Sequence, residues 1–210
     1  DKAIFGHFLT LEALGIYNIG YFLASFPLLL VRAVNSRIMI PLYRDHHPAS
    51  SAANFARMRK LRLIMSGGAL VMLGGLSMIG VPLVGIMYDG RYAAAGLIVA
   101  AVALIQMPEV IGITYDQSAL AVGDSRNYFW LQAVKAGVQT VALLVGVEIA
   151  GLQGALIGQA VALVALHPAV VVLARKHKAW DALNDLVLVV LALVLVAGSW
   201  WVNSVLLGMF

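Results

Sequence analysis

Long apolar runs separated by short polar segments dominate the chain. A membrane-spanning helix needs about 20 mostly apolar residues, and six windows reach that length. They cover residues 14–34, 63–87, 93–122, 128–147, 152–174 and 186–206. A shorter apolar stretch, residues 3–9, resembles the end of a further helix, and we find no long run with the period of two expected for a membrane strand. The pattern predicts an all-α polytopic membrane protein with six transmembrane helices plus a truncated one.

The connections between these windows are short and polar, as in residues 88–92, 123–127 and 148–151. Helices joined so tightly are antiparallel neighbours. Because no linker or polar domain interrupts the windows, we expect residues 1–210 to form a single transmembrane helical lobe. The helical pattern of the first window continues past Arg37 to Tyr43, so this helix should extend beyond the hydrocarbon core and end near Pro41 or the turn at residues 45–48.

Composition excludes several classes of protein. Hydrophobic residues make up 62% of the chain and charged residues 11%, which is too apolar for a soluble domain. The chain has no cysteine, so disulfides, thiolate metal sites and cysteine nucleophiles are excluded. Glycine-rich phosphate loops and nucleophile elbows are also missing, and we therefore expect neither an enzyme nor a bound cofactor or metal.

The basic residues are distributed unevenly between alternate connections. One set of connections contains nine of them: Arg44, Arg57, Arg59, Lys60, Arg62, Arg126, Arg175, Lys176 and Lys178. The other set contains only Arg91. Since cytoplasmic loops carry the excess of Lys and Arg, the first set should be cytoplasmic and the C-terminus extracytoplasmic. This explains the net charge of +4 without a nucleic-acid partner.

Ionisable residues inside a bilayer are costly and usually have a function. Glu109 lies near the middle of its window, next to Pro108, where we expect a kink. Asp116 follows seven residues later on the same helical face, on a stripe with Gln106 and Ile113. Glu109 should therefore be the deeper carboxylate, while Asp116, closer to the cytoplasmic end, should be hydrated.

Two further polar stripes occur at helical spacing. One comprises Gln132, Lys135 and Gln139, and the other Asn18, Tyr21, Ser25 and Arg32. The short turn at residues 123–127 makes the helices of Lys135 and Asp116 neighbours, so Lys135 can approach Asp116 or Glu109. Three polar stripes in so apolar a chain predict a wet interior cavity.

Simpler explanations remain open for several of these residues. Lys135 and Asp116 could form a static salt bridge, and Arg32 and Arg37 could extend to the lipid headgroups. His46, His47 and His167 are expected to be turn or hydrogen-bonded structural residues, because no second ligand lies at metal-binding spacing. The small residues Gly154, Gly158 and Ala162 predict close helix packing, as do Gly67, Gly68, Gly74 and Gly75.

Several ordered motifs resemble those of bacterial polysaccharide (O-antigen type) flippases. At the N-terminus they are the segments DKAIFG, residues 1–6, and LGIYNIGY, residues 14–21. Later ones are FPLL (26–29), IPLYR (40–44), AVGDSR (121–126) and GLQGA (151–155). The resemblance covers essentially the whole chain, in the right order, and implies membership of the multidrug/oligosaccharidyl-lipid/polysaccharide exporter superfamily.

This resemblance implies an exporter-type fold with two helical lobes around a cavity, of which the chain would be the C-terminal one. It also implies a transporter that moves an undecaprenyl-pyrophosphate-linked oligosaccharide across the bacterial cytoplasmic membrane, using an ion gradient. Its partners would be that lipid-linked oligosaccharide, membrane lipids, an N-terminal lobe of the same protein, and polysaccharide polymerase and ligase machinery. The start at Asp1, without an initiator Met, fits the expectation of a longer protein.

Under this hypothesis the cavity residues divide into two groups. The expected substrate-binding residues are Arg32, Lys135, Lys2, Gln132, Gln139 and Asn18, and the expected ion-coupling residues are Glu109 and Asp116. A multidrug/cation antiporter of the same superfamily is the main alternative, but it would require a smaller, aromatic and acidic pocket. A membrane glycosyltransferase or acyltransferase fits less well, because such enzymes carry a catalytic loop and these loops are short and basic.

Overall fold

The computed structural model describes residues 2–8, 10–206 and 208 of the chain. This part is almost entirely helical and contains no strand, which confirms the predicted all-α class. In chain order the elements are α1 (Lys2–Phe8), α2 (Leu11–Asp45), η1 (Pro48–Ser50), α3 (Ala52–Met87), η2 (Gly90–Tyr92), α4 (Ala93–Ile105), α5 (Met107–Ala121), α6 (Ser125–Lys176) and α7 (Ala182–Leu206). The predicted extension of α2 is confirmed, since this helix ends at Asp45.

Four of the described helices, α2, α3, α6 and α7, are long and apolar enough to cross a membrane. The pair α4 and α5 would provide a fifth span if its two halves act together. Many large apolar side chains on these helices face outwards; Val71, Val172 and Val194, for example, are more than half exposed. Such a surface suits lipid better than water.

The third predicted window is bent by 43° between α4 and α5, at Gln106. Pro108 lies in the first turn of α5 and has no N–H to donate to the carbonyl of Leu104, four residues earlier. The missing backbone bond explains the bend, and the predicted kink is confirmed. The same bend sets the direction of α5, which carries both Glu109 and Asp116.

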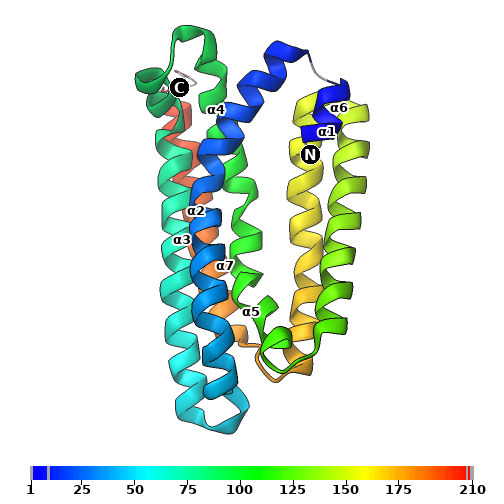
Figure 1. Cartoon of the computed structure of the whole chain (residues 1–210). Helices are drawn as coiled ribbons and strands as arrows, with labels where there is room; N and C mark the ends of the chain where they lie inside the picture. The colour runs from blue at the N-terminus through cyan, green and yellow to red at the C-terminus, as the bar shows by residue number, and fades with distance from the viewer. Residues whose placement is uncertain (1, 9, 207, 209–210) are drawn as a thin grey trace.

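Helix α6 reverses direction at Ala150 and Gly151, which have non-helical dihedral angles. Gly151 has φ of 56° and ψ of −139°, a conformation that glycine adopts readily because it has no Cβ. The chain therefore folds back on itself (Figure 1), as the predicted turn at 148–151 requires. We call residues 125–149 the first arm and residues 152–176 the second arm of α6; the fourth and fifth predicted windows lie in these two arms.

Small residues allow the two arms to pack in close contact. A Cβ atom on Gly154 would lie 2.1 Å from the carbonyl oxygen of Gly146, and one on Gly158 would lie 2.3 Å from that of Ala142. The predicted small-residue face is confirmed here. On α3 the outcome is mixed: Gly74 packs closely against Leu195 of α7, whereas a Cβ atom on Gly68 or Gly75 would meet no atom within 4 Å.

Helices α2, α3, α4, α5 and α7 form a bundle, and the α6 hairpin stands beside it (Figure 1). The hairpin packs mainly along α5 at one end and contacts α1 at the other. Between these contacts the first arm and α2 are separated. The connections that carry most basic residues, α2–α3, α5–α6 and α6–α7, lie at one end of the molecule (Figure 1).

The close approach of the two arms makes a stability prediction. Replacing Gly154 with Ala should destabilise the hairpin by about 1–3 kcal/mol, because the new methyl group meets backbone that cannot rotate away. Gly137→Ala, in the first arm, is the matched control, since no atom lies within 4 Å of its added Cβ. Thermal unfolding in detergent micelles measures both, and equal stability of the two variants would contradict the packing described here.

Candidate functional site

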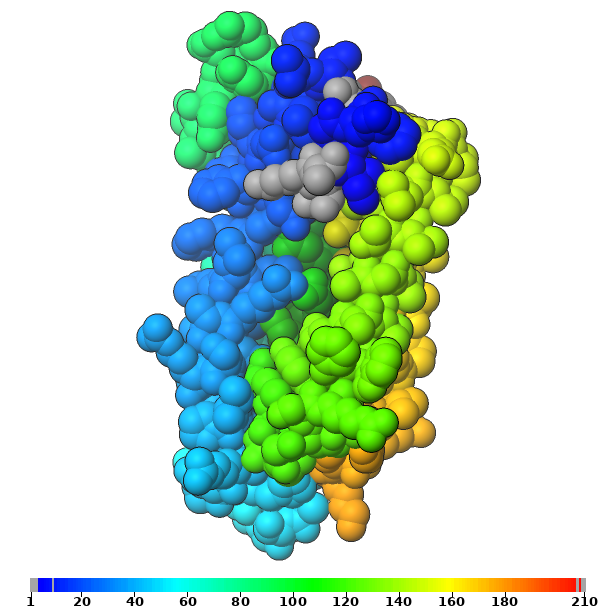
Figure 2. Space-filling view, turned by 45° about the vertical axis from the view of Figure 1, so that its right-hand side comes forward, coloured from blue at the N-terminus to red at the C-terminus, as the bar shows by residue number. Residues whose placement is uncertain are grey.

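A polar groove runs between α2, the α4–α5 pair and the first arm of α6. It consists of two adjoining pockets of about 490 and 400 Å³, which share Arg32, Glu109, Ala136 and Gln139. Figure 2 shows the hollow between α2, in blue, and the first arm, in yellow-green, with the green helices behind. Residues of all three predicted polar stripes line this groove, which we call the central groove.

Arg32 of α2 and Glu109 of α5 form an ion pair across the central groove. The guanidinium donates a hydrogen bond from Nη2 to the Glu109 Oε1 atom. The Arg32 side chain is 52% exposed and that of Glu109 is 21% exposed, so water can reach this pair. The partner of Glu109 is therefore Arg32, and sequence spacing had suggested only Lys135.

A second ion pair joins α5 to the first arm of α6. Lys135 donates from Nζ to the Oδ2 atom of Asp116 over 2.6 Å, and Gln132 reaches the same oxygen at 3.5 Å. The side chains of Lys135 and Asp116 are only 16% and 12% exposed. The predicted approach of Lys135 to Asp116 is confirmed.

The expectation that Asp116 is hydrated is wrong, while the predicted depth of Glu109 in the membrane stays a prediction. Asp116 is the more enclosed carboxylate, because the first arm packs against α5 near the turn that joins them and covers Asp116. Seven residues further along, at Glu109, the bundle and the hairpin have separated and the groove is open. Distance from the end of a helix therefore predicted the wrong order of burial.

The other predicted binding residues have different surroundings. Gln139 lines both pockets and Gln132 lines the smaller one. Asn18 is half-buried and lines neither pocket. The side chain of Lys2 lies outside the described residues. Arg32 and Lys135 each have a carboxylate partner, so the central groove carries two cations and two anions and has no free positive charge among the residues described.

Several buried acceptor oxygens around the central groove have no hydrogen-bond partner among the described residues. They are Asn35 Oδ1, Gln106 Oε1, Asp116 Oδ1 and Gln117 Oε1. Because an unsatisfied buried acceptor is costly, such atoms favour ligands or water that donate hydrogen bonds. Hydroxyl-rich groups meet this requirement.

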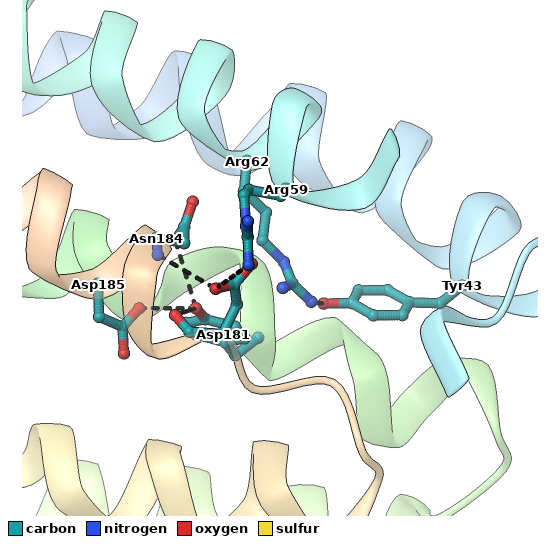
Figure 3. A network of polar contacts seen from close by, with 7 residues as sticks. Tyr43, Arg59, Arg62, Asp181, Asn184 and Asp185 are labelled. Carbon is teal, nitrogen blue, oxygen red and sulfur yellow. Dashed lines mark hydrogen bonds and ion pairs between the residues drawn. The ribbon is translucent and has the colours of Figure 1, made fainter. Parts of the chain in front are cut away.

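A second polar cluster, which the sequence pattern did not predict, joins α2, α3 and α5 to the start of α7 (Figure 3). Arg62, counted above among the cytoplasmic loop residues, is fully buried inside α3. It donates a hydrogen bond to the hydroxyl of Tyr43, and its guanidinium lies 4.5 Å from the ring centroid of Tyr115. The loop assignment is wrong because α3 begins at Ala52, well before Arg62. The rings of Tyr43 and Tyr115 stabilise the buried positive charge.

Carboxylates of α7 and of the residues just before it complete this second cluster. Asp181 accepts two hydrogen bonds from Arg59, at 2.5 and 3.0 Å, and also caps the backbone N–H of Asn184. Asp185 accepts from Tyr115 at 2.6 Å and from Trp180 at 2.9 Å. Together with Arg62 these contacts join α2, α3, α5 and α7. The Asp181-Ala182-Leu183-Asn184 sequence, an N-cap pattern, was the one available signal.

His47 and His167 have structural partners. His167 Nε2 lies 3.4 Å from Asp185 Oδ2, and His47 accepts a backbone hydrogen bond within its turn. Among the described residues, no group of three or more His, Cys, Asp or Glu side chains could hold a metal ion.

Hydrogen bonds from Lys176 and then Asn127 hold the pKa of Asp124 at about 2, so this carboxylate is charged and ties the two ends of the hairpin.

Comparisons with protein-family models, curated proteins and solved structures found no match to this chain. The function is therefore proposed from the residues and geometry of the central groove together with the sequence motifs.

The two ion pairs of the groove should differ in their effect on stability. Lys135→Met leaves the enclosed Asp116 without its cation and should cost roughly 3–5 kcal/mol, whereas Arg32→Gln, at a hydrated pair, should cost about 0–1 kcal/mol. Adding Asp116→Asn to Lys135→Met should recover most of the loss. Unfolding midpoints in mixed micelles measure all three variants; an additive double variant would show that the Lys135–Asp116 contact contributes nothing.

Proposed function

We propose that the chain is one lobe of a transporter that flips an undecaprenyl-pyrophosphate-linked oligosaccharide across the bacterial cytoplasmic membrane for polysaccharide or lipopolysaccharide biosynthesis. The observation that carries this proposal is the central groove, in which two interhelical ion pairs face a polar channel between long apolar helices. The motifs that resemble O-antigen type flippases support the same function.

The groove suits both parts of such a substrate. A pyrophosphate is an anion that can compete with Glu109 for Arg32, whose guanidinium matches phosphate oxygens in a fork. The amide oxygens of Gln132 and Gln139, which line the groove, can accept hydrogen bonds from sugar hydroxyls. The cation for the anion and the acceptors for the glycan thus lie in one groove, and the apolar helix surfaces beside it suit the polyprenyl chain.

The pairing of Arg32 with Glu109 also supports coupling to an ion gradient. A proton or other cation on Glu109 would cancel its charge and free Arg32 for the substrate; loss of that ion would restore the pair and displace the anion. Binding of ion and substrate would then be linked through one contact, which is the differential interaction that coupling requires. The Lys135–Asp116 ion pair, which is more enclosed, would take part in the same switch.

We further propose that each arm of α6 crosses the membrane, which would give six spans in all. The basic connections gather at one end (Figure 1), which favours a cytoplasmic location for that end and an extracytoplasmic C-terminus. In this arrangement a second lobe would close the open side of the central groove. Polymerase and ligase machinery would receive the flipped glycan.

A multidrug/cation antiporter is the alternative, favoured by the carboxylates Glu109 and Asp116, which could attract an organic cation. Both carboxylates are already paired, and few aromatic side chains line the groove; they are Tyr21, Phe22 and Tyr128. An organic cation would have to displace Arg32 or Lys135 from its partner. The groove therefore fits an anionic, hydroxyl-rich substrate better.

The proposed orientation predicts which connections react with an impermeant thiol reagent. Because the chain has no cysteine, single substitutions give an unambiguous signal. Arg91→Cys should be labelled on intact cells, and Arg126→Cys only after permeabilisation. Both side chains are exposed in the structure, so access alone does not distinguish them. The reverse labelling pattern would invert the orientation.

The proposed mechanism predicts a loss of export when the Arg32–Glu109 contact is altered. In cells whose surface polysaccharide depends on this protein, Arg32→Ala should reduce export and Arg32→Lys should reduce it less, because Lys keeps the charge but not the fork. Glu109→Gln mimics the protonated carboxyl, so it should fold normally but export roughly tenfold less, within the usual 5–150-fold range of coupling, and lose its pH dependence.

The matched control is Arg126→Ala, which removes an exposed cation outside the groove. Surface polysaccharide and accumulated lipid-linked glycan are measured together with protein abundance. Normal export by both Arg32→Ala and Glu109→Gln at normal abundance would overturn the proposed role of the groove. Retained glycan export with lost resistance to cationic drugs would favour the antiporter.

A further inference from the structure

A second groove lies between the end of α2 and the start of α3, near the connection that joins them. Its volume is about 580 Å³, and it shares no lining residue with the central groove. Arg37 and Ile38 of α2 form one wall, and Arg57, Lys60 and Ile64 of α3 form the other. We call it the basic–apolar groove, after these five residues.

The three cations of this groove have no ionic partner. Arg37, Arg57 and Lys60 are exposed, and none of them forms an ion pair or a side-chain hydrogen bond with a described residue. In contrast, Arg32, Arg59, Lys135 and Lys176 each have a carboxylate partner. One carboxylate, Asp45, also lines the groove, so three positive charges face one negative charge. The charge of this groove is complementary to an anion.

Apolar side chains continue the groove along the helices. Ile38 is 42% exposed and Ile64 is 61% exposed, with Leu61 half-buried beside them. On α3, Arg57 and Lys60 lie nearer the connection than Ile64, which is followed by the long apolar body of the helix. On α3 the order from the connection inwards is therefore cation and then apolar surface, and on α2 Arg37 and Ile38 are adjacent residues at nearly the same depth. A phospholipid has the same order, with its phosphate at the interface and its acyl chains below.

We propose that the basic–apolar groove binds one anionic phospholipid of the surrounding membrane. Its phosphate lies among Arg37, Arg57 and Lys60, and one acyl chain runs from Ile38, which is level with Arg37, along Ile64 of α3. Long Arg and Lys side chains reach an interfacial phosphate easily while their stems cover apolar surface. This lipid is a resident ligand on the outside of the α2–α3 pair and differs from the proposed cargo of the central groove.

Native mass spectrometry of the purified protein tests the proposal with phosphatidylglycerol and phosphatidylcholine that carry identical acyl chains. Wild-type protein should retain one phosphatidylglycerol in preference to phosphatidylcholine. The double variant R57Q/K60Q should bind phosphatidylglycerol roughly thirtyfold more weakly, since two interfacial cations are lost. The matched control R126Q/K178Q loses the same charge at two exposed positions outside the groove and should bind like wild type.

One further variant and a folding control keep the result decisive. I38S/I64S retains every charge, so weaker binding of long-chain but not of dihexanoyl phosphatidylglycerol would confirm the acyl-chain contact. All variants should elute as wild type from a sizing column, because the altered side chains are exposed.

Equal loss of phosphatidylglycerol binding in R57Q/K60Q and R126Q/K178Q would show attraction by surface charge alone and overturn the site. Displacement of the lipid by a polyprenyl pyrophosphate, sensitive to R57Q/K60Q, would assign the groove to the cargo and overturn it as well.

Discussion

Charge in a low-dielectric environment is the constraint on which this structure depends. An ionised side chain enclosed among apolar helices is tolerated only with a partner, because its desolvation is otherwise uncompensated. Lys135 meets Asp116, Arg59 meets Asp181, and Arg62 lies among the rings of two tyrosines. Each of these contacts joins different helices, or in the case of Asp181 a helix and the residue that caps α7, so the positions of the charges help determine which helices lie together.

The pairs differ in how firmly they hold the helices, and this difference follows the architecture. Contacts of Arg62, Asp181 and Asp185 are buried and connect four helices, so that end of the bundle is fixed. The Arg32–Glu109 pair is open to the central groove on one side. The buried polar contacts around Arg62 therefore hold the helices in position, while the Arg32–Glu109 pair in the central groove remains accessible to a ligand.

Much of the fold follows from the sequence, because apolar windows and turn residues are local signals. The bend at Pro108, the end of α2 and the reversal at Gly151 were all predicted on that basis. Predictions that needed tertiary information failed, as for the burial of Arg62 and the expected hydration of Asp116. Helical spacing shows which residues share a face, but the neighbour that covers this face comes from distant parts of the chain.

For the candidate site, spacing identified the three polar stripes and the Lys135–Asp116 contact. It could not identify Arg32 as the partner of Glu109, since these residues are 77 positions apart and their helices are joined by two others. Asn18 lines neither pocket for a similar reason. It belongs to a polar stripe, but the part of α2 that lines the groove begins only at Tyr21. The sequence shows which face of a helix is polar, but it does not show how far along that face a cavity extends.

The break at Gln106 has a mechanical consequence. Glu109 and Asp116 both belong to α5, a single rigid helix of 15 residues that begins just after the break. A change in the angle at this hinge would displace both carboxylates at once, one relative to α2 and the other relative to the first arm of α6. The two ion pairs are thus linked through one helix: a ligand that moved α5 while opening the Arg32–Glu109 pair would also move Asp116 relative to Lys135.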